Sequence, residues 1–148
     1  MGGWNIVYAL INFAILAFVL VKFGKKMVVN MINGNRQQIS DALRSCADEK
    51  RIDLIVTTGG TGLSPRDVTP EATADVIERE IRAIPVAMWV EGLKITPRAM
   101  LSRAVAGTRG SSLIINLPGS EKAARENLAA VIGALEHALH MIAAEGHG

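Results

Sequence analysis

The chain has 148 residues and a formal net charge of +2, the size of one ordinary domain with no strong electrostatic field. Aromatic residues make up only 4% of it, too few for a base-stacking surface, so no nucleic-acid partner is predicted. The single cysteine, Cys46, excludes an internal disulfide and is typical of a reducing compartment.

An apolar segment opens the chain. Trp4–Phe23 reads WNIVYALINFAILAFVLVKF, and no charged side chain occurs before Lys22. Its length of about 20 residues is enough to cross a ~30 Å hydrocarbon layer as a helix. Aromatic residues near one end and lysines at the other are typical of membrane helices: Trp4 and Tyr8, then Lys22, Lys25 and Lys26. The pattern predicts a membrane helix within residues 1–26, a junction at 27–35 and a cytoplasmic domain at 36–148.

An alternative places the whole chain in the cytoplasm. In this reading Asn5–Ile11 is a buried strand, Asn12–Lys26 a helix and Met27–Ile32 a second strand. Hydrophobic periodicity does not separate the two readings, because a segment that is apolar all round occurs both in cores and in membranes.

The rest of the chain alternates helical and strand patterns. Asn33–Asn35 is a turn signal, and the strands Ile52–Val56 and Ser112–Asn116 are short, apolar and rich in β-branched residues. Capping and periodicity predict helices over Arg36–Lys50, Thr69–Arg82, Val86–Glu91, Arg98–Ala106 and Glu121–Ala144. Helices that alternate with buried strands predict an α/β fold with a parallel sheet.

A glycine-rich turn, TTGGTG, follows the first of these strands and leads into a helix. Gly59, Gly60 and Gly62 would let backbone N–H groups approach an anion, and the helix N-terminus adds partial positive charge. Hydroxyl donors are also available at Thr57, Thr58, Thr61 and, in a second loop, Ser120. Asp67 lies beside the first loop, where a carboxylate binds Mg²⁺ or orients a nucleophile.

The second loop, LPGS, follows Asn116 at the end of the other buried strand. Ligands of parallel sheets collect beyond the carboxyl ends of the strands, so the two loops predict one anion site. Arg103 and Arg109 flank the second strand and could meet an anionic substrate, although isolated arginines are more often surface or ion-pair residues. His137 and His140 are spaced i, i+3 without an acidic or cysteine partner, a pattern that favours ordinary helix histidines.

Three longer strings carry a family resemblance: DLIVTTGGTGLSPRDVTPEAT, EGLKITPRAMLSRAVAGTRGSSLIINLPGSEKA and ALEHALHMI. Together, over about residues 36–145, they resemble the molybdenum-cofactor-binding domain family, and within it the molybdopterin adenylyltransferases. The resemblance implies a cytoplasmic, doubly wound α/β domain with a mostly parallel sheet, commonly a homotrimer. It also implies a reaction in which molybdopterin attacks the α-phosphate of MgATP, giving adenylylated molybdopterin and pyrophosphate.

Site residues follow from the same resemblance by position. Asp67 matches the family's functional aspartate, and the resemblance implies that its carboxylate binds Mg²⁺. The positions that would bind molybdopterin or ATP are Thr58, Gly59, Gly60, Thr61, Gly62 and Ser64 in the first loop, and Asn116, Leu117, Pro118, Gly119 and Ser120 in the second.

The chain departs from the family pattern at its start. The usual first strand, loop and helix are not visible, and Gly34 stands where a second functional aspartate is expected. The N-terminal segment instead resembles the membrane helix of the b subunit of bacterial ATP synthase, with a seam between Lys26 and Arg36. Three functions are consistent with these features: an adenylyltransferase, a non-catalytic molybdopterin- or nucleotide-binding module, and a membrane-anchored stalk-like assembly protein.

Overall fold

A computed structural model describes residues 3–145, and the chain divides into two compact units between Gly34 and Asn35. Helix α1, Gly3–Arg44, continues through this division. The turn predicted at Asn33–Asn35 is therefore wrong: one glycine inside a helix costs only about 1 kcal/mol, and the flanking residues outweigh it. The alternative with strands over residues 5–11 and 27–32 is wrong too, because both segments are helical.

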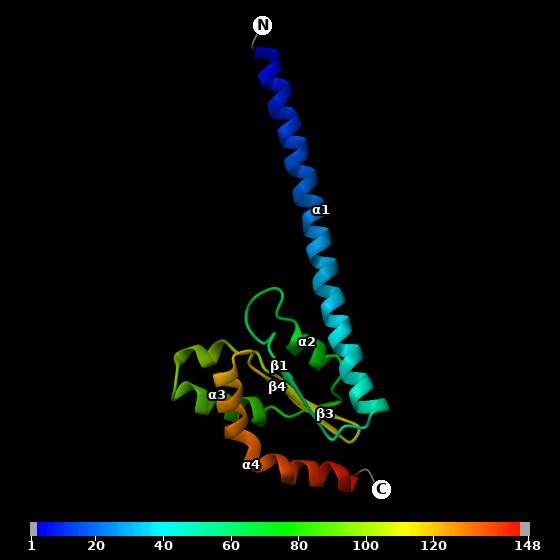
Figure 1. The fold of residues 1–148 in the computed structure, drawn as a ribbon, viewed down its shortest axis with the longest axis vertical. Coiled ribbons are helices and arrows are strands. Elements are labelled where there is room, and N and C mark those ends of the chain that lie inside the picture. The colour runs from blue at the N-terminus through cyan, green and yellow to red at the C-terminus, as the bar shows by residue number, and fades with distance from the viewer. Residues whose placement is uncertain (1–2, 146–148) are drawn as a thin grey trace. The chain divides into compact units, whose positions relative to one another are not determined.

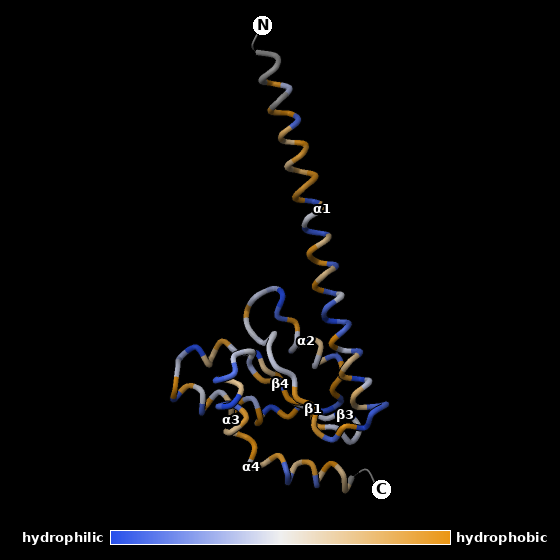
Figure 2. Tube along the Cα trace, viewed as in Figure 1, coloured by the Kyte–Doolittle hydropathy of each residue, from blue (hydrophilic) through white to orange (hydrophobic). Residues whose placement is uncertain are grey.

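The first unit is a helix with large apolar side chains in contact with solvent. Phe13, Phe18 and Phe23 are 71%, 66% and 68% exposed. Hydropathy colouring shows this part of α1 as largely apolar (Figure 2). The Lys22 ammonium group lies 5.8 Å from the centre of the Phe18 ring, within cation–π range. The side chain of Trp4, predicted to be interfacial, lies outside what the structure describes.

The second unit contains a four-stranded sheet of order β1-β4-β3-β2 (Figure 1). β1 (Leu54–Thr58) pairs in parallel with β4 (Ser112–Leu117). β3 (Ala106–Arg109) and β2 (Arg79–Glu80) extend the sheet in antiparallel fashion. The α/β class is confirmed, but the sheet is mixed, and the described strands form one parallel pairing.

Two strands were not predicted, because local sequence gives them little signal. The helix predicted to end at Arg82 is α2, Thr69–Ala74, and the chain then enters the two-residue strand β2. The helix predicted over Arg98–Ala106 is a short 3₁₀ turn, Pro97–Leu101, followed by β3. Both segments gain strand structure from backbone pairing within the sheet built on β4, a tertiary effect that propensity does not encode.

Helices cover both faces of the sheet. One core joins α3 (Ala83–Leu93) and α4 (Glu121–Glu145) to β3 and β4 through buried residues such as Met88, Leu113 and Leu135. The other core joins Leu43, Ala47 in the π-helical turn Ser45–Glu49, and the opposite sheet face at Ile55 and Ile114. β4 is buried along its whole length, so it is the central strand that fixes the position of the loop after it.

One helix in the described part of the chain, Glu121–Ala144 of α4, is long and apolar enough to cross a membrane by length and composition. Its mean hydropathy is 1.3. The same helix supplies Val131 and Leu135 to the core of the second unit, so its apolar residues already have a packing role.

Two arginine–aspartate pairs tie helices to other segments of the second unit. Arg109 binds Asp48 through Nε and Nη2 and also donates to the carbonyl of Val76. Arg36 binds Asp75 at 2.6 Å. Hydrogen bonding to the guanidinium lowers the pKa of Asp48 and of Asp75 below its ordinary value. The expectation that Arg109 is an ion-pair residue is confirmed.

Candidate functional site

The loops after β1 and β4 meet at one edge of the sheet. The N–H of Gly59 donates to the carbonyl of Leu117 at 3.0 Å, which extends the parallel pairing into the loops. A Cβ atom on Gly119 would lie 3.2 Å from the Cα of Gly59, so the two backbones are in contact. The geometry that the sequence predicted, two loops forming one edge, is present.

Two glycines of the first loop have left-handed backbones, Gly59 at φ +89° and Gly60 at φ +68°. Residues with a side chain rarely adopt this conformation, so glycine is required here. The carbonyl of Gly60 accepts from the N–H of Thr69, the first residue of α2, at 3.2 Å. The loop therefore bends back on the start of the helix.

The predicted site residues differ in their accessibility. Thr58, Ser64, Gly119 and Ser120 are exposed, and Gly59, Gly60, Gly62, Asp67 and Pro118 are half-buried. Thr61 is buried at 5% exposure, and its carbonyl accepts from the N–H of Arg103. The loops thus present both accessible hydroxyl groups and accessible glycine backbone to a ligand.

Asp67 closes the first loop on itself. Its Oδ2 accepts from the N–H of Ser64 at 3.0 Å, and its own N–H donates to the carbonyl of Ser64 at 2.9 Å. An open hollow of about 420 Å³ lies beside it, lined by loop residues together with Glu71 and Arg103. The carboxylate is thus held at the rim of a space next to the glycine loop.

The side chain of Asn116 lies in the interior, whereas the sequence predicted that it would contact a ligand. Its side chain is fully buried and donates to the hydroxyl oxygens of Thr57 and Thr73, both at 2.9 Å. Its Oδ1 accepts from the N–H of Val105 at 3.1 Å. The amide is therefore committed to internal hydrogen bonds that join β1, α2 and the segment before β3.

Sequence reasoning missed how Arg103 and Glu71 act at this site. Arg103 pairs with Glu71, which confirms the ion-pair expectation, and it also donates to the carbonyls of Gly62 and Asp67. The two residues lie 32 positions apart, and no spacing rule relates them. Gly34, at the position expected for a second aspartate, lies inside α1 and provides no carboxylate.

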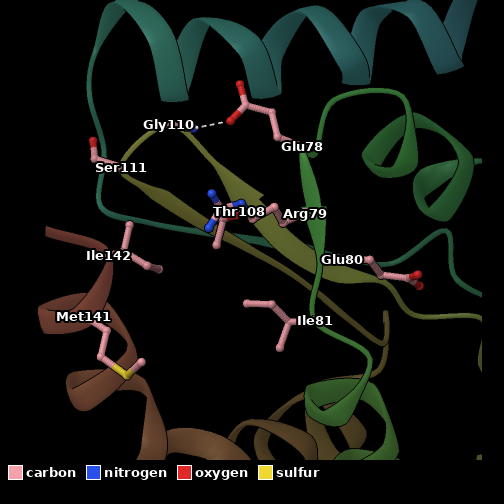
Figure 3. A pocket seen from close by; sticks show the side chains of 9 residues that line it. All are labelled: Glu78, Arg79, Glu80, Ile81, Thr108, Gly110, Ser111, Met141 and Ile142. Atoms are coloured by element: carbon pink, nitrogen blue, oxygen red, sulfur yellow. Dashed lines mark hydrogen bonds between the residues drawn. The ribbon is translucent and has the colours of Figure 1, made fainter. Parts of the chain in front are cut away.

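A larger hollow lies elsewhere in the second unit. It measures about 520 Å³ and is lined by the segment Glu78–Ile81, by residues around the β3–β4 turn and by Met141 and Ile142 of α4 (Figure 3). The N–H of Gly110 donates to Glu78 across its rim at 3.1 Å. Because this turn precedes β4, the hollow lies at the opposite end of that strand from LPGS and is separate from the predicted site.

The donor set near Asp67 fits a magnesium ion that arrives with a nucleotide. Among the described residues, no group of three or more His, Cys, Asp or Glu side chains could hold a metal by itself. Magnesium, however, commonly binds one or two carboxylates together with substrate phosphates. One carboxylate beside a glycine-rich loop fits that requirement, with Asp67 as the residue that would hold the ion.

The fold and these loops define an α/β domain in which two loops meet at one edge of the sheet, and comparison with known proteins specifies its family. The family described as probable molybdopterin binding domain matches residues 12–137. The chain therefore belongs to this family. The match begins within α1, ahead of the boundary near residue 36 that the sequence motifs suggested.

Individual relatives agree with the family. The chain is 44% identical over 112 residues to the molybdopterin adenylyltransferase of Helicobacter pylori, a match that covers 76% of this chain and 64% of that protein. It is 56% identical over 89 residues to gephyrin of Dictyostelium discoideum, covering 60% of this chain and 12% of gephyrin. The chain thus spans less than two thirds of each of these two relatives.

Solved structures support the same family assignment. The molybdopterin biosynthesis enzyme MoaB of Thermus thermophilus is 52% identical, with a TM-score of 0.69, and the match covers 72% of this chain and 67% of that one. The Mog protein of Mycobacterium ulcerans is 42% identical with a TM-score of 0.68, covering 72% and 69%. Neither the relatives nor the structures named here link the N-terminal helix to an ATP synthase stalk subunit.

The contact between Gly60 and α2 gives a prediction about loop stability. A Cβ atom on Gly60 would lie 2.3 Å from Thr69 Oγ1, whereas one on Gly110, also left-handed at φ +51°, would meet nothing within 4 Å. Gly60→Ala is expected to lower the free energy of unfolding by about 3 kcal/mol, and Gly110→Ala by only ~1 kcal/mol. Urea denaturation of both variants measures the difference. Equal losses would mean that the loop moves freely away from Thr69.

Proposed function

We propose that the chain is a molybdopterin adenylyltransferase of molybdenum cofactor biosynthesis, with ATP and molybdopterin as substrates and Mg²⁺ bound with ATP. The observation that carries the proposal is the contact between the Gly59 and Gly119 loops, with Asp67 held beside them. The name of the Helicobacter pylori relative, molybdopterin adenylyltransferase, supports the same reaction, and the Thermus thermophilus relative is named a molybdopterin biosynthesis enzyme. The homotrimer implied by the family resemblance is part of the proposal.

The residues have separate roles in this reaction. The backbone of Gly59, Gly60 and Gly62, with the hydroxyl groups of Thr58, Ser64 and Ser120, binds the phosphate groups of the two substrates. Asp67 would hold the magnesium ion, whose positive charge would offset that of the phosphates and help to orient them. Phosphoryl-type transfer needs little covalent chemistry from the protein, so positioning and charge neutralisation account for most of the catalysis.

Incubation of the full chain with molybdopterin and α-labelled MgATP tests the proposal. Labelled adenylylated molybdopterin and an equal amount of pyrophosphate are the expected products. Binding of molybdopterin without turnover would instead support the non-catalytic binding module, which the absence of a carboxylate at Gly34 favours. A folded protein that neither binds nor reacts would contradict both functions.

We also propose that residues 4–23 anchor the protein to a membrane, with the domain on the cytoplasmic side. The exposed phenylalanines of α1 support this, because a helix with large apolar side chains all round gains free energy in lipid. The full chain is expected in the membrane fraction after a carbonate wash, and detergent should release it. Recovery of the full chain in the soluble fraction without detergent would overturn the anchor and leave the enzymatic proposal intact.

A further inference from the structure

Arg103 lies between the 3₁₀ turn Pro97–Leu101 and β3, and it binds the loop after β1 through both backbone and side chain. Its N–H donates to the carbonyl of Thr61 at 2.9 Å, and its Nε donates to the carbonyl of Gly62 at 2.7 Å. The two terminal nitrogens bind the carbonyl of Asp67 and the carboxylate of Glu71. One residue therefore holds the loop at three points and the following helix at a fourth.

These contacts are the main attachment of residues 61–67 to the rest of the domain. The other hydrogen bonds recorded for residues 61–67 lie within the loop, such as those between Ser64 and Asp67. In the part of the chain that the structure describes, each recorded hydrogen bond to residues 61–67 from beyond α2 comes from Arg103. Leu63, Ser64, Pro65 and Arg66 are exposed, so packing does little to replace it.

The chemistry of the arginine side chain matches this task. Guanidinium is planar and directs several N–H groups along fixed lines, whereas a lysine ammonium acts as a point charge. Three acceptors in different directions therefore need arginine. The Arg103 and Glu71 side chains are 34% and 38% exposed, so the ion pair alone is largely screened. The hydrogen bonds to the carbonyls of Gly62 and Asp67 therefore determine the position of the loop.

Glu71 adds an electrostatic reason for the pairing. Its Oε2 is buried and has no hydrogen-bond partner, and its Oε1 accepts from the guanidinium of Arg103. Arg36 also interacts with this carboxylate, through its charge. Without Arg103, the Glu71 carboxylate would lose the cation bonded to it and leave additional negative charge in the hollow beside Asp67, where substrate phosphates are proposed to bind. Such a charge would repel those phosphates.

We propose that Arg103 is a positioning residue that fixes the Asp67 carboxylate for adenylyl transfer and does not itself contact the substrates. The inference rests on the proposed function. A displacement of about 1 Å at a reacting centre can cost ~100-fold in rate, so a loop tether can control catalysis from outside the site. Arg103 then acts through Asp67, whereas Glu71 keeps the guanidinium neutralised and in place.

Four variants test the proposal: Arg103→Ala, Arg103→Lys, Glu71→Gln and, as a matched control, Arg109→Ala. Arg109 also uses three side-chain donors on one aspartate and one carbonyl, but it lies by the β3–β4 turn, away from the loops. Arg103→Ala is expected to lower kcat/KM by roughly 10- to 100-fold, mainly through kcat. Arg103→Lys should recover less than a third of the lost activity. Glu71→Gln should cost less than Arg103→Ala, and Arg109→Ala should leave kcat/KM within about twofold.

Hydrogen exchange supplies a readout that does not depend on activity. In Arg103→Ala, amides of residues 61–67 should exchange at least tenfold faster while those of β4 keep their protection. If the wild-type chain proves inactive, the proposed function fails, and loop exchange still decides whether Arg103 orders the loop. Full activity in Arg103→Lys, or loop exchange unchanged in Arg103→Ala, would overturn the inference.

Discussion

Asp67→Asn is expected to lower the rate of adenylylation at least ~100-fold while leaving the fold intact. Loss of one preorganised electrostatic group commonly costs 10²- to 10³-fold in kcat. Asparagine keeps the size of the side chain and an oxygen that can accept from the N–H of Ser64, now 3.0 Å away from Oδ2. What it loses is the negative charge that would hold magnesium beside the substrate phosphates.

Asp53→Asn is the matched control for this prediction. Asp53 is exposed and immediately precedes β1, so it lies at the opposite end of that strand from the loop. Its carbonyl, which the substitution does not change, accepts from the N–H of Leu113. Rates come from labelled product formation and stability from calorimetry. An Asp67→Asn variant with more than a third of the wild-type rate would remove Asp67 from the mechanism.

Asn116→Ala is expected to lower the free energy of unfolding by about 3 kcal/mol. The substitution removes three side-chain hydrogen bonds and leaves the buried Thr73 hydroxyl and the Val105 N–H without their partner. A net hydrogen bond contributes about 1 kcal/mol, and a buried group left unpaired costs ~1–3 kcal/mol, so the effects together give this magnitude. A two-state fit to urea denaturation of the second unit measures it.

The half-buried Asn127 on α4 provides a control with the same chemical change. Asn127→Ala should cost about 0.5 kcal/mol or less, as for most substitutions outside hydrogen-bond networks. If Asn116→Ala instead weakened substrate binding at full stability, the original prediction of direct ligand contact would be supported. The internal bonds of the amide would then not be its main role.

The sequence predicted those parts of the fold that are encoded locally. β1, β4, α4 and the two loops each have a compact signal, such as the buried run LIIN or the glycines of TTGGTG. β2 and β3 have no such local signal. β2 consists of two exposed residues and β3 consists mostly of small ones, so both become strands only through pairing in the sheet built on β4. A local turn signal at Asn33–Asn35 was also overridden by the helix around it.

Candidate site residues could be predicted where the residue types and their spacing together indicate a ligand-binding loop. They could not be predicted where a side chain is held by residues that are distant in the sequence. Glycines, hydroxyls and Asp67 could be proposed because a phosphate loop needs them in sequence order. Arg103 binds a loop that lies about forty residues earlier in the chain, a relation that only the tertiary structure reveals. Asn116 was correctly placed at the strand end, yet its orientation into the interior depends on Thr57 and Thr73 across the fold.

The contact between Gly59 and Gly119 also bears on how the protein folds. These residues are far apart in sequence, and they can meet only after β1 and β4 have paired in parallel. Parallel pairing of distant segments is a slow, high-contact-order event, so the edge where the two loops meet should be among the late structures to form. A ligand that needs both loops would bind the native state alone, and its presence during synthesis would shift molecules out of partly folded forms.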